Sequence, residues 1–177
     1  MCSSDLYPVD GRPFGDGVFP TASGKVEFHR PELAQIGLSA LPTYEPPVER
    51  PGGGHGEFAL LTPKQHQRFL NSSYSHLPHH GPAEGGPVVE LHPDDAQRLG
   101  LAEGDTAEVR NQRGSLRLTV RHSTKVRPGV VAVPWGWWHT DEVGGVANSL
   151  SSDTLTDWGG GVAYSSTTVD VLAAPRA

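Results

Sequence analysis

The chain has 177 residues, and its 36% hydrophobic content with 22 glycines and 16 prolines favours short strands and turns over helical bundles. Its 14 basic and 20 acidic residues give a formal charge of −6, which excludes a general attraction to nucleic acid or an anionic membrane surface. The single cysteine, Cys2, excludes an internal disulfide and a thiolate metal cluster, and no apolar run approaches the roughly 20 residues of a membrane span.

Residues 1–56 are predicted to form an irregular connecting segment from upstream domains, because proline or glycine recurs every few residues. Within it, Lys25–His29 alternates like a strand, and Pro31–Ile36 is expected to form one or two helical turns. The first residues show no export signal, so a cytoplasmic protein is expected, with a periplasmic one as the alternative if a signal precedes Met1.

The first clear strand, Phe58–Leu61, is apolar and ends at Thr62-Pro63, where a polar loop begins. A buried strand that delivers polar groups onto a loop is typical of ligand binding, with cations for phosphate and amides for a heterocycle. The alternative is a soluble turn followed by a polar helix. The polar residues of this loop are Lys64, Gln65, His66, Gln67, Arg68, Asn71, Ser72 and Ser73.

Four more elements follow in order. Val88–Leu91 is a short apolar strand, and His92–Gly100 reads as a two-turn helix with proline in its first turn and a closing glycine. Asp105–Arg110 and Ser115–Arg121 alternate with period two around the tight reversal of residues 111–114.

Two further strands complete the count. Val130–Val133 is a continuous apolar run suited to a buried strand, and Val162–Val171 contains the last strand candidate. Three tryptophans, Trp135, Trp137 and Trp138, follow the first of these strands. They could form an aromatic wall for a flat ring, although sealing a barrel end or packing on another domain is the favoured reading for two of them.

The segment between these strands, residues 143–164, is long and weakly periodic, which favours a binding loop over a solvated connection. Asn148 offers a donor and an acceptor to a pterin or purine edge, and Ser149 and Asp153 lie close to it in the sequence.

A histidine cluster, His76, His79 and His80, makes a metal site conceivable. A flexible polar loop is the favoured reading, because Pro78 stiffens the segment and no carboxylate stands at ligand spacing.

Taken in order, these pieces resemble the C-terminal domain of the molybdopterin oxidoreductases, the dimethyl sulfoxide reductase and formate dehydrogenase family. The resemblance covers nearly everything from Phe19 to Val171. It rests on residues 61–64 with 71–73, 88–95, 100–105, 111–114, 127–131 and 148–150, together with the upstream FPTASGKVEF.

The resemblance implies a mainly β fold, a six-stranded double-psi β-barrel with one or two short helices over residues 57–177. It also implies binding of bis(molybdopterin guanine dinucleotide) with molybdenum. Pro63-Lys64 stands where many members carry Gly-Arg, so the charge is kept but the forked grip of arginine is lost. The expected cofactor-binding residues are Thr62, Lys64, Gln65, His66, Arg68, Asn71, Ser72, Ser73, Trp135, Asn148, Ser149 and Asp153.

The family places the molybdenum ligand, and any 4Fe-4S cluster, in an earlier domain. The chain is therefore expected to be a fragment that is inactive alone, with the upstream domains of the same oxidoreductase as its partners and with no catalytic or metal-ligating residue of its own. Two alternatives stay open: a free-standing β-barrel interaction module, and a metallohydrolase that uses His76, His79 and His80.

Overall fold

The computed structural model divides the chain into two compact units, Met1–Glu45 and Pro46–Ala177. In the first unit, Pro31–Ile36 forms the 3-10 helix η1, which begins with Pro31 and ends at Gly37 in the left-handed conformation. Lys25–His29 is not a strand, so that prediction was wrong. The described residues are 14–41, 43–65, 77, 85–138, 145–156, 160–163 and 165–174.

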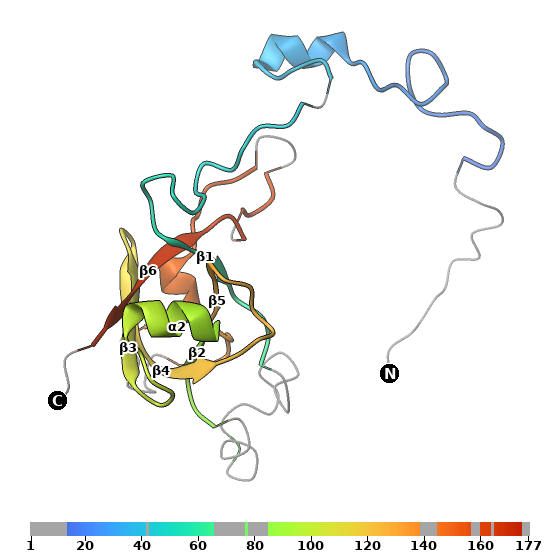
Figure 1. The fold of residues 1–177 in the computed structure, drawn as a ribbon. Helices are drawn as coiled ribbons and strands as arrows, with labels where there is room; N and C mark the ends of the chain where they lie inside the picture. Colours follow the sequence, from blue (N-terminus) through green and yellow to red (C-terminus); the bar gives the residue numbers. More distant parts are fainter. Residues whose placement is uncertain are drawn as a thin grey trace. The chain divides into compact units, whose positions relative to one another are not determined.

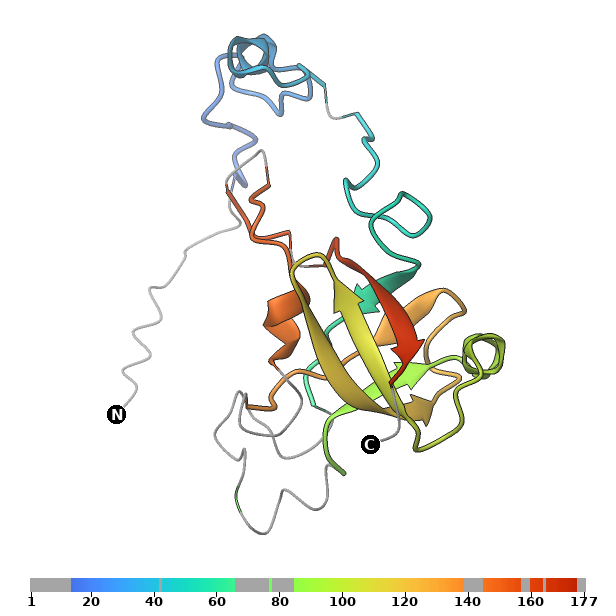
Figure 2. The same ribbon diagram turned by 90° about the vertical axis from the view of Figure 1, so that its left-hand side faces the viewer.

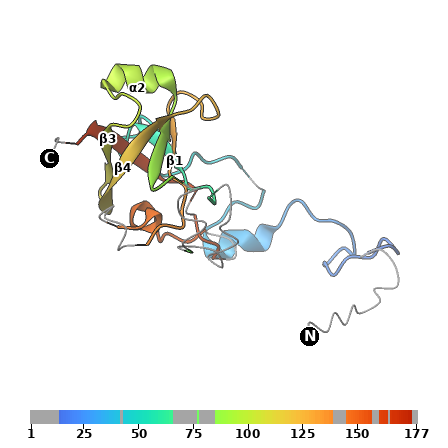
Figure 3. The ribbon, with the colours of Figure 1, turned by 90° about the horizontal axis from the view of Figure 1, so that it is seen from below.

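The second unit is a closed six-stranded barrel with the order β1-β5-β2-β4-β3-β6 (Figure 1). The 3-10 helix η3, Ala147–Leu150, and the α-helix α2, Pro93–Leu99, accompany it and lie on opposite sides of the barrel (Figure 3). The strands are β1 (Phe58–Leu61), β2 (Val88–Leu91), β3 (Thr106–Asn111), β4 (Gly114–His122), β5 (Val130–Ala132) and β6 (Thr168–Ala173).

The strand order interlocks the two halves of the chain. β5 lies between the consecutive strands β1 and β2, and β2 lies between the consecutive strands β4 and β5. Two pairs are parallel, β1 with β5 and β2 with β4, whereas the other four are antiparallel. Exchanging β1, β2 and β3 with β4, β5 and β6 leaves every neighbour and every direction unchanged. This is the mainly β, double-psi barrel that was expected.

The barrel core follows from alternation along the strands. In β4, Leu116, Leu118 and Val120 are buried while Arg117 and Thr119 face outward. β4 pairs with β3 and β3 with β6, so three long strands stand side by side in Figure 2. The last strand is shifted from its predicted range, because Val162 forms only an isolated bridge with Leu155 and regular pairing begins at Thr168.

Helix α2 is tied to the barrel by a buried carboxylate. Asp95 is 6% exposed, and its two oxygens accept hydrogen bonds from the amide of Gly129 at 2.8 Å and from Arg98 Nη2 at 3.0 Å. Arg98 also pairs with Glu57 and lies over the Phe58 ring, 5.4 Å from its centroid. The helix is thereby held to the turn before β5 and to the start of β1. Nowhere in the described ranges does a helix have the length and apolar character to cross a membrane.

The barrel unit includes residues 46–56, which the sequence analysis assigned to the connecting segment. Gly56 passes so close to β6 that a Cβ there would come within 2.7 Å of the Val169 nitrogen. Glu49 reaches Arg113 and Thr168, contacts made by residues far apart in the sequence. These contacts bring the entering segment onto the barrel, so the unit begins at Pro46 rather than at Glu57.

We expect Asp95→Ala to lower the free energy of unfolding by about 1–3 kcal/mol, because it removes the acceptor for Gly129 and the charged partner of Arg98. Urea unfolding of the protein checks this. Asp94→Ala is the control, since that side chain is 79% exposed and contributes about 0.3–1 kcal/mol through the helix dipole. Equal losses in the two variants would contradict this role for Asp95.

Candidate functional site

Two loops from distant parts of the chain meet at one rim of the barrel. β1 and β5 are parallel neighbours, so the residues that follow them, Thr62 and Trp135, leave the barrel at the same edge. The pairing continues past the strands. The Trp135 amide donates to the Pro63 carbonyl at 3.0 Å, and Lys64 and Trp135 form an isolated parallel β-bridge.

A hollow of about 510 Å³ opens at this rim; we call it the rim hollow. Thr62 and Trp135 line it together with residues of η3 and the segment that follows. Its volume lies within the range of small-molecule sites. The lining residues are Thr62, Trp135, Asn148, Ser151, Ser152, Asp153 and Val162.

A second hollow of about 710 Å³, the basic hollow, is lined in part by Pro63, Lys64 and Gln65 of the loop that follows β1. It contains three cationic side chains, Lys64, Arg121 and Lys125, of which Arg121 forms an ion pair with Glu90. Gln65 and Ser123 add hydrogen-bonding groups. Because its cations outnumber its single acidic residue, the basic hollow is suited to an anion such as a phosphate.

The structure brings together part of the predicted site. Thr62, Trp135, Asn148 and Asp153 share the rim hollow. Lys64 and Gln65 line the adjacent basic hollow. Ser149 is not in either lining set; its Oγ accepts from the amide of Val146 at 3.3 Å inside the turn. His66, Arg68, Asn71, Ser72 and Ser73 lie outside the described residues.

Sequence reasoning missed several lining residues. Ser151 and Ser152 directly follow the predicted loop residues, and their short polar side chains were the available signal. Arg121 and Lys125 could not be foreseen, because Arg121, in β4, and Lys125, which follows β4, reach the basic hollow through the parallel pairing of β2 with β4.

Among the described residues, the tryptophan cluster is not buried in the barrel. Trp135 is 37% exposed and Trp138 57% exposed, and Trp137 is only partly buried and lines the basic hollow. Trp135 contributes an aromatic side chain to the lining of the rim hollow. The histidines His76, His79 and His80 fall outside the described residues. Among the residues that are described, no group of three His, Cys, Asp or Glu side chains could hold a metal ion.

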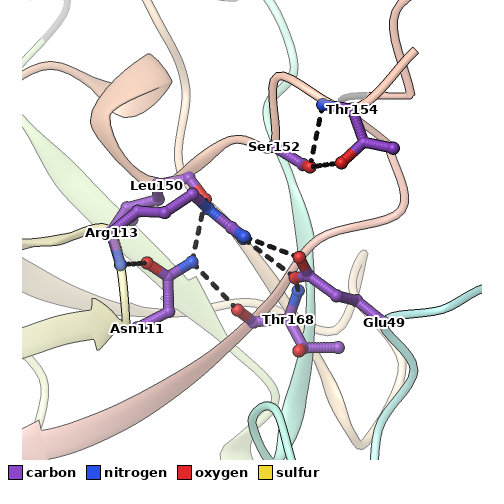
Figure 4. Close-up of polar contacts among 7 residues, drawn as sticks. All are labelled: Glu49, Asn111, Arg113, Leu150, Ser152, Thr154 and Thr168. Atoms are coloured by element: carbon purple, nitrogen blue, oxygen red, sulfur yellow. Dashed lines mark hydrogen bonds and ion pairs between the residues drawn. The ribbon is translucent and has the colours of Figure 1, made fainter.

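Helix η3, which carries Asn148, is held to the barrel through one carbonyl oxygen (Figure 4). The Leu150 oxygen accepts from Asn111 Nδ2 and from Arg113 Nε, both at 2.8 Å. Asn111 Nδ2 also donates to the Thr168 carbonyl at 3.2 Å, and Asn111 Oδ1 accepts from the Arg113 amide at 2.9 Å. The Leu150 side chain is fully buried beneath these contacts. The β3–β4 reversal therefore fixes the position of η3.

Gly114 and Gly145 allow η3 to approach this closely. A Cβ on Gly114 would lie 3.2 Å from the Ser149 carbonyl oxygen, and one on Gly145 would lie 3.0 Å from the Leu116 side chain. A Cβ at either position would make a contact tighter than usual, so the neighbouring atoms would have to shift by a few tenths of an ångström.

Arg113 is held in turn by Glu49. Its Nη1 and Nη2 donate to the two carboxylate oxygens of Glu49 at 2.6 and 2.8 Å, a bidentate pair, and the Thr168 amide donates to the same carboxylate at 3.2 Å. The Arg113 hydrogen bond is the main cause that lowers the pKa of Glu49. Glu49 likewise raises the pKa of Arg113, with a smaller contribution from the charge of Asp153.

The rim hollow has polar capacity that the described residues leave unused. The buried Ser151 Oγ has no hydrogen-bond partner among them, although a buried hydroxyl ordinarily has one. Ser152 Oγ donates to Thr154 Oγ1 at 2.9 Å and accepts from the Thr154 amide at 3.2 Å, which leaves one of its two acceptor positions. A ligand with donors and acceptors along one edge would satisfy these groups, together with the amide of Asn148 and the carboxylate of Asp153. The lining therefore fits a heterocyclic, polar ligand.

Comparison with known proteins agrees with this chemistry. Residues 58–168 match the family described as the Molydopterin dinucleotide binding domain. The probable oxidoreductase YoaE of Bacillus subtilis is 35% identical over 90% of this chain and 23% of its own length. The dimethyl sulfoxide/trimethylamine N-oxide reductase of Rhodobacter capsulatus is 30% identical over 67% of this chain and 15% of its own.

A solved structure shares the fold. The acetylene hydratase from Pelobacter acetylenicus superposes with a TM-score of 0.68 at 22% identity, over 89% of this chain and 24% of that one. The chain thus spans about a quarter or less of the relatives cited here.

We expect Asn111→Ala to loosen η3, because it removes the side chain that joins the Leu150 and Thr168 carbonyls. Amide hydrogen exchange of residues 147–151 should become about tenfold faster, which corresponds to about 1.4 kcal/mol of local stability. Arg110→Ala, on the exposed face of the same strand, is the control and should leave this exchange unchanged. Unaltered exchange in Asn111→Ala would show that η3 is held by other contacts.

The lowered pKa of Glu49 predicts a pH dependence. A carboxylate whose pKa is lower in the folded state adds stability above its ordinary value of 4.5 and loses this contribution as the pH falls through the lowered value. The stability difference between wild type and Glu49→Gln should therefore be largest above pH 4.5 and shrink in acid. Thermal unfolding at a series of pH values measures it, and a difference that grows in acid would contradict the assignment.

Proposed function

The chain belongs to the molybdopterin dinucleotide-binding domain family, and we propose that its rim hollow and basic hollow together bind that dinucleotide within a larger molybdenum-dependent oxidoreductase. One observation carries the proposal: Thr62, after β1, and Asn148, in η3, line the same hollow although they lie far apart in the sequence. The family match favours this function over a free-standing interaction module and over a histidine-based metallohydrolase.

The rim hollow is assigned to a flat heterocycle. Trp135 offers a ring face, and Asn148 offers a donor and an acceptor to the edge of a ring. Asp153 is an acceptor when ionised, so it suits the adjacent N–H donors on one edge of guanine. This chemistry supports the guanine form of the dinucleotide. The bis form, with two dinucleotides on one metal, follows from the family resemblance.

The basic hollow is assigned to phosphate. Lys64 comes from the first loop, and Arg121 and Lys125 line the same hollow. Lysine acts as a point charge without the planar fork of arginine, so Lys64 would contribute charge rather than a bidentate grip. Arg68 and Asn71, further along the first loop, are proposed to complete this site.

The chain itself performs binding and orientation. The metal carried by the dinucleotide would supply the electron-transfer chemistry, and its protein ligand is proposed to lie in the part of the protein outside this chain. The side chains of the rim hollow would hold the heterocycle in one orientation, and Trp135 would shield one of its faces from water. An iron–sulfur cluster, where the complete protein has one, would also lie elsewhere, because four thiolate ligands are needed and Cys2 is the sole cysteine here.

The class of reaction rests on the named relatives. The relative with 35% identity over 90% of this chain is named an oxidoreductase, and others are named dimethyl sulfoxide reductases. A relative from Syntrophotalea acetylenica, 30% identical over 81% of this chain and 20% of its own length, is named acetylene hydratase. A binding domain of this kind thus occurs in proteins named for different reactions, so the substrate would be selected by other parts of the complete protein.

We expect Asn148→Ala and Lys64→Ala, made in the complete protein, each to release the dinucleotide about tenfold faster, the effect of losing about 1.4 kcal/mol of binding. Nucleotide liberated by acid hydrolysis and quantified by chromatography gives both the rate and the identity of the base. Arg117→Ala is the matched control, because it removes an exposed cation from β4 outside both hollows. Release at the wild-type rate in both variants would overturn the assignment, and a base other than guanine would overturn the guanine form alone.

A further inference from the structure

Glu49 lies outside both hollows, in the irregular segment before the barrel, yet its side chain is only 9% exposed. A carboxylate that is nearly buried must be compensated by donors. Glu49 is compensated by three, namely the two Nη atoms of Arg113 and the Thr168 amide. The hydrogen bond with the Thr168 amide alone would attach the entering segment to β6. The bidentate pair with Arg113 therefore has a further role.

That role is to position the Arg113 guanidinium. Its Nη edge is occupied by Glu49, and its Nε donates to the Leu150 carbonyl at the end of η3 (Figure 4). A guanidinium is planar and rigid, so holding one edge orients the other. Glu49 therefore determines where Arg113 can place its hydrogen bond to η3.

The position of η3 matters for the rim hollow. η3 carries Asn148, and Ser151, Ser152 and Asp153, which directly follow η3, line the same hollow. A shift of the Leu150 carbonyl would therefore displace the lining of the hollow on both sides of Leu150.

We propose that Glu49 is a positioning residue for the dinucleotide site: through Arg113 it sets the position of η3 and of the lining residues that η3 and the following segment contribute. The proposal rests on the proposed function of the rim hollow. It makes the segment that enters the barrel part of the binding site, although none of its residues lines the hollow.

The first test is independent of the ligand. In the complete protein, Glu49→Gln keeps the shape of the side chain and removes its charge, and amide exchange of residues 147–151 should become about tenfold faster. Arg113→Lys should have the same effect, because lysine keeps the charge but cannot hold Glu49 and the Leu150 carbonyl with one planar group. Glu57→Gln is the matched control: it breaks the carboxylate–arginine pair with Arg98 beside α2, on the side of the barrel opposite η3 (Figure 3).

The second test is a double-mutant cycle on dinucleotide release. Glu49→Gln should accelerate release about tenfold, and Arg113→Lys should do so by a similar factor. The double variant should be no faster than either single variant by more than about twofold, because both changes break the same pair. Glu57→Gln should leave the rate within twofold of wild type.

The outcomes separate the two proposals. Unchanged exchange in residues 147–151 of Glu49→Gln, or release factors that multiply in the double variant, would overturn the positioning role. If Glu49→Gln lowered the thermal stability but left the rate of dinucleotide release unchanged, Glu49 would serve only to attach the entering segment to the barrel. That result would also overturn the positioning role. Faster exchange in Glu49→Gln together with release that Asp153→Asn and Asn148→Ala leave unchanged would instead overturn the proposed function of the hollow.

Discussion

The parallel pairing of β1 with β5 is the constraint on which the candidate site depends. These strands are far apart in the sequence, and their pairing places Thr62 and Trp135 at one rim of the barrel. The interlocked strand order makes this arrangement unavoidable, because β5 fills the gap between β1 and β2. The part of the site that lies on the ends of paired, buried strands is rigid. The remaining lining residues come from loops, which need other contacts to hold their positions.

Hydrogen bonds to backbone carbonyls provide that support. η3 has a single turn and cannot hold its own position, so its last carbonyl is bound twice, by Asn111 and by Arg113. Glu49 extends the same network to the segment that precedes the barrel. Three parts of the chain with little regular structure are thereby joined around one partly buried guanidinium and one partly buried side-chain amide. This explains how an irregular chain can present a defined polar surface at the rim.

The strands and α2 were predictable because their signals are local. Alternation in β4 reports which side chains face the core, and the proline and glycine at the ends of α2 fix its limits. Lys25–His29 shows where this reasoning fails. It alternates correctly, but a strand also needs a partner, and none is paired with it in the described part of the chain. The start of β6 was misplaced for the same reason, since pairing rather than composition decides where a strand begins.

The sequence by itself determined the family, the six-stranded barrel and the loops that carry Thr62 and Asn148, because these follow from ordered motifs and from periodic burial. Only the tertiary structure decided which polar residues share a hollow and which hold the loops. Glu49 and Arg113 are 64 positions apart, and neither carries a local sign of the other. Ser149 was expected at the ligand but bonds within its own turn, while the hydroxyl of Ser151, two positions later, has no partner among the residues that the structure describes. Such choices depend on distances across the fold, which no window of sequence contains.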